Sequence, residues 1–321
     1  SVHAIESHEL QVTTSIGVSF FPSDGADAET LIINADTAMY QAKENGRERF
    51  QFYEPTMNVR EVERQALEMG LRGAIAGREF ELYYQPKVNL ATRAVVGAEA
   101  LLRWTHPVRG SIAPGEFIPV AESCGLMQPI GAWVLRQACA QAQAWRGAGL
   151  PAITMAVNVS AVEFRDKSYL ENLLAIVGET GLDANFLELE LTEGVMINRV
   201  ESTLAILKSL RDIGVKVVVD DFGTGYSSLS YLRNFPVSAI KIDRSFVREI
   251  GTEGEDSAMV TAVIGMARNL KLRVVAEGVE TQEQLRFLRY HRCDEAQGHY
   301  FGWPVVPLKF ASLLKAGGMA L

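Results

Sequence analysis

From Phe80 onward, the chain alternates short apolar runs with longer amphipathic segments. Eight apolar runs predict strands near residues 80–87, 95–103, 153–159, 186–192, 216–220, 238–243, 272–277 and 293–298. Helix-length segments separate most of these runs, which is the pattern of repeated βα units. The first two runs are joined by a turn too short for a crossover helix, so we expect this pair to be antiparallel. Together these features predict an α/β fold, a (β/α)8 TIM-like barrel with an antiparallel first strand.

The first part of the chain carries fewer elements. An alternating run over residues 12–20 predicts a strand, residues 28–45 carry a helical apolar stripe, and residues 50–53 predict a short strand. Because so few elements cannot close a core, we expect residues 1–56 to be an incomplete α+β segment, the C-terminal fragment of a domain that begins upstream. Residues 57–78 then predict a connecting helix, and residues 79–321 the barrel domain.

Composition narrows the possible partners and settings. The 321 residues are 48% hydrophobic, which is enough for a large core, and 39 acidic against 31 basic residues give a net charge of -8. This balance is opposite to the basic surface that duplex nucleic acid requires. Three scattered cysteines without metal-type spacing favour a reducing, cytoplasmic compartment. No apolar run is long enough for a membrane span, so this segment predicts no membrane contact, although upstream regions could anchor the parent protein.

Polar side chains stand at the ends of seven predicted strands, after interiors that are otherwise apolar. They are Glu99, Asn158, Glu190, Asp220, Asp221, Lys241, Glu277 and Gln297. In a barrel of this type the carboxyl ends of the strands meet on one face, where the active site lies. The sequence therefore predicts that these groups converge.

Five carboxylates in a small volume need cations to neutralise them. Ligation by oxygen alone favours Mg²⁺ or Mn²⁺ over zinc, and the adjacent Asp220 and Asp221 are suited to bridging two ions. Two such ions predict hydrolysis of a phosphodiester. Lys241 is placed to orient the attacking water and Arg103 to bind a phosphate. The glycine-rich residues 222–228 predict a loop that orders over a ligand.

Each feature also has a simpler explanation. A single carboxylate at a strand end is more often a helix cap or a member of an ion pair, and the Asp220–Asp221 pair alone could cap the next helix. Lys241 could be an ion-pair partner only, and the glycine-rich segment a plain turn. The joint occurrence favours metal binding, because independent caps have no reason to fall at the same end of so many strands.

Seven ordered motifs between Phe80 and Pro307 closely resemble the EAL-domain family of cyclic di-GMP phosphodiesterases. They are residues 84–87 (YQPK), 99–104 (EALLRW), 158–160 (NVS), 190–193 (ELTE), 220–229 (DDFGTGYSSL), 241–243 (KID) and 276–280 (AEGVE), followed by the Gln297–Gly298 pair. The chain departs from the family pattern at Leu191, where isoleucine is common, and at His299, where tyrosine is usual. The resemblance implies opening of cyclic di-GMP to linear pGpG and lower levels of this second messenger in a bacterial cell.

The resemblance also implies roles for individual residues. Metal ligands would be Glu99, Asn158, Glu190, Asp220, Asp221 and Glu277, which agrees with the two Mg²⁺ or Mn²⁺ ions inferred above. Because Ca²⁺ has a larger and laxer coordination than Mg²⁺, we expect it to be inhibitory. Glu99, Asp220, Asp221, Lys241 and Glu193 would serve catalysis, with Glu193 steadying the glycine-rich loop. Gln85, Arg103, Asn158, Glu280 and Gln297 would contact the substrate. A homodimer through the barrel is implied as well. The alternative is a non-catalytic cyclic di-GMP receptor on the same barrel, but such a receptor is expected to lose carboxylates and none is missing here.

Residues 10–53 resemble the C-terminal end of a GGDEF diguanylate cyclase domain, through residues 15–18 (SIGV), 35–40 (ADTAMY), 42–43 (AK) and 46–47 (GR). The catalytic Gly-Gly-Asp-Glu-Phe stretch of that family does not occur in this chain. We therefore expect no cyclase activity from this chain, and a parent protein that is a tandem regulator with sensory regions upstream.

Overall fold

The computed structural model describes residues 2–5, 8–11, 13–44, 46, 48–197, 200–224, 232–251 and 256–316. The chain forms two compact units, residues 1–73 and 74–321, and the division falls inside helix α2 (Pro55–Ala74). The boundaries at residues 56 and 78 expected from the sequence stay predictions. Among the described residues, no helix combines the length and apolar character that crossing a membrane requires.

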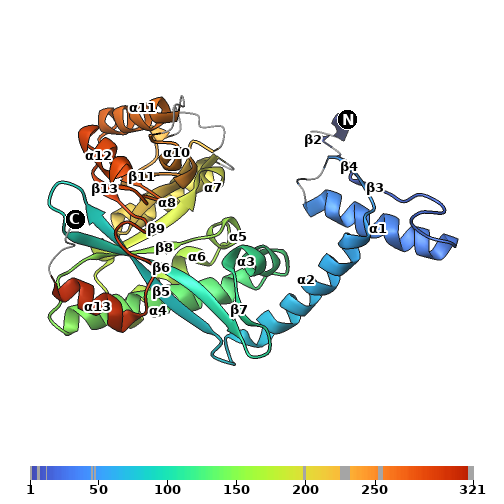
Figure 1. The fold of residues 1–321 in the computed structure, drawn as a ribbon, viewed down its shortest axis with the longest axis horizontal. Coiled ribbons are helices and arrows are strands. Elements are labelled where there is room, and N and C mark those ends of the chain that lie inside the picture. Colours follow the sequence, from blue (N-terminus) through green and yellow to red (C-terminus); the bar gives the residue numbers. More distant parts are fainter. Residues whose placement is uncertain are drawn as a thin grey trace. The chain divides into compact units, whose positions relative to one another are not determined.

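The larger unit is a closed barrel with helices around it (Figure 1). Its strands are β5 (Phe80–Asn89), β6 (Val95–His106), β8 (Thr154–Asn158), β9 (Leu187–Thr192), β10 (Lys216–Phe222), β11 (Ala239–Ile242), β12 (Arg273–Ala276) and β13 (Glu295–Ala296). They follow the order β5-β13-β12-β11-β10-β9-β8-β6, and a β5–β6 pairing closes the ring. All eight strands predicted from the apolar runs are therefore present.

Strand β5 runs against both of its neighbours. It pairs antiparallel with β6, Gln85 opposite Glu99, and antiparallel with β13, Ala296 opposite Val88, whereas the other neighbouring barrel strands pair in parallel. The predicted antiparallel first strand is confirmed. A short strand that the sequence analysis missed, β7 (Gly110–Ile112), extends β6 as a hairpin.

Helices connect the parallel strands and cover the outside of the ring (Figure 1). They are α3 (Pro114–Ser123), α4 (Met127–Gly147), α5 (Ala161–Phe164), α6 (Tyr169–Thr180), η1 (Ala184–Phe186), α7 (Glu193–Ile197), α8 (Val200–Asp212), α10 (Arg244–Arg248), α11 (Asp256–Asn269), α12 (Gln282–Tyr290) and α13 (Pro307–Lys315).

The barrel strands bury both faces, as strand β9 illustrates. Its leucines Leu187, Leu189 and Leu191 are fully buried, and the alternating Glu188 and Glu190 are 1% exposed. Because successive side chains of a strand point to opposite faces, the two glutamates share the barrel interior while the leucines face the helices. The barrel therefore buries charged groups below its mouth as well, which the sequence analysis did not anticipate.

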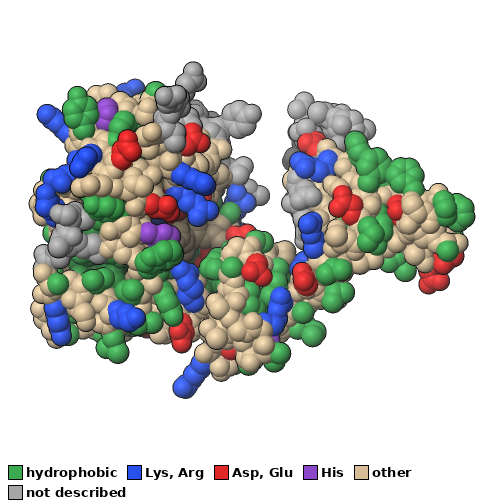
Figure 2. Space-filling model, viewed as in Figure 1, with side chains coloured by type: hydrophobic (Ala, Val, Ile, Leu, Met, Phe, Trp, Pro, Cys, Tyr) green, Lys and Arg blue, Asp and Glu red, His purple; other side chains and the backbone are tan. Residues whose placement is uncertain are grey.

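The smaller unit contains β1 (Val2–Ile5), β2 (His8–Gln11), β3 (Ile16–Val18), α1 (Ala28–Glu44), β4 (Phe50–Phe52) and most of α2. Strands β3 and β4 pair in parallel and pack against α1, at the positions that the sequence predicts, while the β1–β2 hairpin was not anticipated. Apolar side chains remain on its surface (Figure 2), among them Phe21 at 70% and Ile32 at 69% exposure. The described part of this unit thus buries little apolar surface of its own.

Candidate active site

A cavity of about 240 Å³ opens at the carboxyl ends of the barrel strands. It is lined by Gln85, Glu99, Asp220, Arg244, Glu277, Gly278, Glu280, Gln297, Gly298 and His299. Glu99, Asp220, Glu277 and Gln297 come from four different strands or their ends, so the predicted convergence of strand ends is present. Arg244 and His299 are lining residues that the sequence analysis did not assign to the site.

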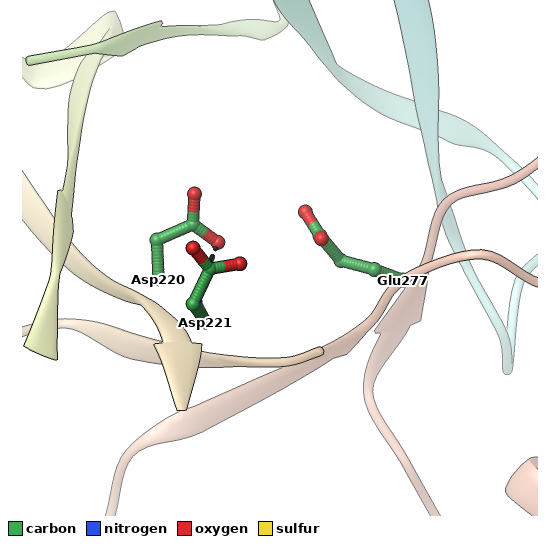
Figure 3. Close-up of side chains that lie close together, drawn as sticks. All are labelled: Asp220, Asp221 and Glu277. Atoms are coloured by element: carbon green, nitrogen blue, oxygen red, sulfur yellow. Dashed lines mark hydrogen bonds between the residues drawn. The ribbon is translucent and has the colours of Figure 1, made fainter. Parts of the chain in front are cut away.

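Asp220 and Asp221 point into the same space although they are neighbours on strand β10. Neighbouring side chains of a regular strand would face opposite ways. Here the pairing of β10 with β11 is irregular between Val219 and Phe222, and Asp221 adopts a left-handed φ of 52°. Both carboxylates consequently face Glu277, which follows β12 (Figure 3), with one oxygen of each within 4.8 Å of the others. Left-handed conformations are uncommon outside glycine, and aspartate tolerates them better than most residues.

Lys241, on strand β11, lies amid the carboxylates and is 1% exposed. Its Nζ is 2.7 Å from Glu190 Oε2, 3.2 Å from Asp220 Oδ1 and 3.7 Å from Glu99 Oε2. It also contacts Glu277 Oε1. Burial alone would lower the pKa of this ammonium, but the surrounding carboxylates raise it well above its usual value. Lys241 therefore stays charged throughout the physiological pH range.

One lysine does not neutralise this set of acids. Burial and the Glu99 charge raise the pKa of Glu190 well above its usual value, and burial raises the pKa of Glu277 to about 7. The pKa of Asp221 is raised by burial and by the neighbouring Asp220. Glu190 Oε1 is buried and accepts no hydrogen bond from the described residues. These carboxylates are thus held at a free-energy cost that a bound cation would relieve.

Glu99 is the exception, because hydrogen bonds and charge favour its ionised form. Burial raises the pKa of Glu99, but Lys241 and hydrogen bonds from Asn158 and Gln297 lower it overall. Asn158 Nδ2 donates to Glu99 Oε1 at 2.6 Å, and Gln297 Nε2 donates to Glu99 Oε2. Asn158 leaves its amide oxygen for another partner. A cluster of ionised oxygens with one amide oxygen is the donor set that suits Mg²⁺ or Mn²⁺.

The predicted substrate-binding residues are divided in the structure. Gln85, Glu280 and Gln297 line the cavity, and Gln297 Nε2 also donates to Gln85 Oε1 at 2.9 Å. Arg103 does not line the cavity; its guanidinium lies over the Tyr83 ring at 5.7 Å and donates to the Leu102 carbonyl at 2.8 Å. The expected phosphate contact of Arg103 therefore stays a prediction.

Glu193 begins helix α7 and is 7% exposed. Its Oε2 accepts a hydrogen bond of 3.4 Å from the Gly223 N–H, just beyond the aspartate pair, while its Oε1 is buried without a hydrogen-bond partner among the described residues. This contact agrees with the role predicted for Glu193 at the start of the glycine-rich segment. Residues 225–231 of that segment lie outside the described residues.

A second group of buried charges lies below the site. Lys87 Nζ contacts Glu188 Oε2 and lies 3.5 Å from Glu190 Oε1, while the Arg273 guanidinium contacts Glu188 and Glu295. Sequence reasoning missed this network. The available signal was the alternation of strand β9, which places Glu188 on the same face as Glu190.

Comparison with protein families finds two matches. The model of the EAL domain matches residues 68–304, and the model of the diguanylate cyclase GGDEF domain matches residues 1–49. Both resemblances noted in the sequence are confirmed.

Among curated proteins, the chain is 42% identical over 303 residues to the bifunctional diguanylate cyclase/cyclic di-GMP phosphodiesterase MucR of Pseudomonas aeruginosa, which covers 94% of this chain and 44% of that protein. It is 40% identical over 313 residues to the cyclic di-GMP phosphodiesterase NbdA of the same organism, covering 98% of this chain and 40% of that protein. The chain thus spans less than half of the length of either relative.

Among solved structures, the PaMucR phosphodiesterase in complex with c-di-GMP superposes with a TM-score of 0.74 at 41% identity, covering 76% of this chain and 99% of that chain. The EAL enzyme Bd1971 in its cAMP- and cyclic-di-GMP-bound form also has a TM-score of 0.74, at 33% identity, covering 79% of this chain and 69% of that chain.

Proposed function

The chain belongs to the EAL-domain family, and on that premise we propose that its barrel is a divalent-metal-dependent phosphodiesterase that opens cyclic di-GMP to linear pGpG. The observation that carries the proposal is the surplus of buried carboxylates at the mouth, with Asp220, Asp221 and Glu277 directed at one point. The relatives named as cyclic di-GMP phosphodiesterases and the c-di-GMP complex of PaMucR support the choice of substrate.

The residues present fit two divalent cations. Asp220, Asp221 and Glu277 offer oxygens within 4.8 Å of one another, and Glu190 offers a buried oxygen without a hydrogen-bond partner among the described residues. Glu99 and Asn158, which are hydrogen-bonded to each other, complete the proposed ligand set. Bound Mg²⁺ or Mn²⁺ would supply charge neutralisation and a water of lowered pKa.

Residues other than the proposed metal ligands orient the water, bind the substrate and hold the glycine-rich segment. Lys241, held among four carboxylates, carries a permanent positive charge that orients the attacking water and stabilises negative charge developing on the phosphate oxygens. Gln85, Gln297 and Glu280 bind the substrate along the cavity wall, and Arg103 and Asn158 are proposed to join them. Glu193 keeps the segment after Asp221 in place through the Gly223 N–H.

Three further parts of the proposal concern the metal preference, the oligomeric state and the cellular setting. Ca²⁺ is expected to support binding but poor hydrolysis, because its larger and less regular coordination disfavours a tight two-metal geometry. A homodimer through the barrel and a cytoplasmic setting in a bacterium stay predictions.

The proposal is tested by incubating the chain with cyclic di-GMP and Mg²⁺ and following pGpG by chromatography, with Ca²⁺ in a parallel reaction. We expect turnover with Mg²⁺ or Mn²⁺ and a much lower rate with Ca²⁺. Binding without turnover in a folded sample would reject the proposal of an enzyme and favour the alternative of a non-catalytic receptor. Equal rates with Ca²⁺ and Mg²⁺ would contradict the metal mechanism alone.

A further inference from the structure

Two aromatic rings lie together at the rim of the active-site cavity. His299 lines the cavity, and the Trp303 ring stacks on the His299 ring with centroids 3.5 Å apart and an interplanar angle of 16°. Both residues follow strand β13 in a turn in which Gly302 N–H donates to Gly298 O at 3.2 Å. The turn is attached to the barrel because Tyr300 N–H donates to Val279 O at 2.9 Å. The pair is therefore held by the backbone at a fixed place beside the site.

The exposure of Trp303 differs from that of the core tryptophans. Its side chain is 65% exposed, whereas Trp104 and Trp145 are 0% and 4% exposed. A single exposed aromatic residue is ordinary on a protein surface and indicates nothing by itself. What distinguishes Trp303 is that it stacks on a cavity-lining ring and still exposes most of its own surface.

The neighbouring polar group is suited to a purine. His299 Nδ1 lies 3.6 Å from Glu280 Oε1, so an exposed carboxylate stands next to the aromatic pair. Proteins recognise unpaired bases by stacking them on aromatic side chains and hydrogen-bonding their edges. The Watson–Crick edge of guanine carries N–H donors, and a carboxylate accepts from such groups.

The cavity lining contains groups suited to both parts of a nucleotide. Glu99, Asp220 and Glu277 belong to the carboxylates at which the proposed metals would hold the phosphate, and Glu280 and His299 line the same cavity. We propose that the His299–Trp303 pair is a stacking platform for a guanine base of the substrate, with Trp303 as the residue that sets affinity for the base. This inference rests on the proposed function, because the base reaches the platform only if the phosphate lies at the carboxylates.

The test compares three variants of the whole chain, Trp303→Ala, Trp303→Phe and the control Tyr290→Ala, in steady-state hydrolysis of cyclic di-GMP with Mg²⁺. Tyr290 is a matched control because it is 83% exposed, contacts His291 and does not line the cavity. Stacking of one base contributes about 1–3 kcal/mol, so Trp303→Ala should raise KM about tenfold while kcat at saturation stays within about twofold. Trp303→Phe should retain most of the affinity, and Tyr290→Ala should match the wild type.

The outcomes separate the platform from the proposed function. If the wild type neither binds nor hydrolyses cyclic di-GMP, the proposed function fails and the platform with it. If the wild type is active and Trp303→Ala keeps the wild-type KM, only the platform is rejected. A parallel loss of kcat, or equal losses for the Phe and Ala variants, would show a structural role of Trp303 and would also reject stacking.

Discussion

At the mouth of the barrel, the ammonium of Lys241 contacts four of the five carboxylates, whereas one layer deeper Lys87 and Arg273 are matched by Glu188 and Glu295. The layers are adjacent, since Glu188 precedes Glu190 by two residues on β9 and Glu295 precedes Gln297 by two residues along the chain. We call the lower set, Lys87, Glu188, Arg273 and Glu295, the inner ion network. The mouth therefore holds a surplus of negative charge, whereas the charges of the inner ion network are paired.

The difference separates a structural arrangement from a functional one. In the inner ion network each charge has a partner, and Lys87 and Arg273 lower the pKa of Glu188 to about 2 against the opposing effect of burial. At the mouth, burial and mutual repulsion raise the pKa of Glu190 and Glu277. A balanced group of buried charges needs nothing further, while a surplus of one sign calls for a ligand of the other.

The largest difference that we expect between substitutions at the mouth and in the inner ion network is in turnover. Asp221→Asn removes a negative charge from the proposed metal cluster and should lower kcat for cyclic di-GMP about 10³-fold or more, equivalent to about 4 kcal/mol. Glu295→Gln, in the inner ion network, removes a charge of the same sign and should leave kcat within about threefold. Both are measured as pGpG formed at saturating Mg²⁺. Comparable losses in the two variants would mean that the two regions do not differ in function.

The next effect concerns stability and its response to metal. Removing one partner of a buried ion pair typically costs about 3–5 kcal/mol, so Lys87→Met and Lys241→Met should both lower the free energy of unfolding by amounts of this order in EDTA. Mg²⁺ should restore part of the stability of Lys241→Met, because a cation replaces the lost ammonium among the carboxylates. For Lys87→Met, Mg²⁺ should raise the free energy of unfolding by no more than it does for the wild type.

Urea unfolding with and without Mg²⁺ measures this response, and circular dichroism checks that each variant is folded. A larger residue at Gly97 is not a suitable substitute for the Lys87→Met variant. A Cβ at Gly97 would lie 2.8 Å from Lys87 Cε, which is too close for an ordinary contact. Equal gains with Mg²⁺ in the two variants would contradict the distinction between mouth and inner ion network.

The sequence predicts the mouth better than the inner ion network for a physical reason. Residues such as Glu99 and Asp220 stand where an apolar run ends, and the barrel topology alone brings strand ends together. Lys87 and Glu188 belong to strands far apart in sequence, and their pairing depends on register across the barrel. The sequence predicts that Asp221 joins the site, but it does not predict the left-handed φ at an irregularity of strand β10 that turns Asp221 there.

The same limit applies to the cavity rim. Arg244 and His299 lie in connections after strands β11 and β13, and local sequence pattern does not fix how such connections return to the mouth. For Arg103 the phosphate contact suggested by its spacing from Glu99 stays a prediction, since in the structure its guanidinium lies over Tyr83.

A third prediction concerns the pH dependence of Mg²⁺ affinity, which should distinguish Glu277 at the mouth from Glu188 in the inner ion network. A metal that binds only the folded chain stabilises it by about 2.7 kcal/mol at a concentration 100 times its dissociation constant. Burial raises the pKa of Glu277 to about 7, so this carboxyl is ionised above pH 7 and must release a proton to bind metal below it. Mg²⁺ affinity should therefore fall about tenfold per pH unit below pH 7, and level off above it.

Isothermal titration with Mg²⁺ between pH 6 and pH 8 measures this dependence. Glu277→Gln serves as the comparison, since it removes the titrating group and should flatten the pH dependence while weakening binding overall. Glu188 offers no such effect, because its pKa of about 2 keeps it ionised throughout this range. Affinity that is constant from pH 6 to pH 8 in the wild type would contradict the role of Glu277 as a ligand.

The smallest expected effect lies at the junction between the metal cluster and the glycine-rich segment. Glu193→Ala removes the acceptor of the Gly223 N–H but none of the proposed ligands, so kcat should fall about tenfold, the cost of about 1.4 kcal/mol, while Mg²⁺ affinity stays near that of the wild type. The control is Glu201→Ala, an exposed glutamate on helix α8. A loss of metal affinity equal to the loss of kcat would show that Glu193 supports the ligands themselves. Retention of both would mean that the Gly223 contact is dispensable, because the segment after Asp221 is then held by other groups.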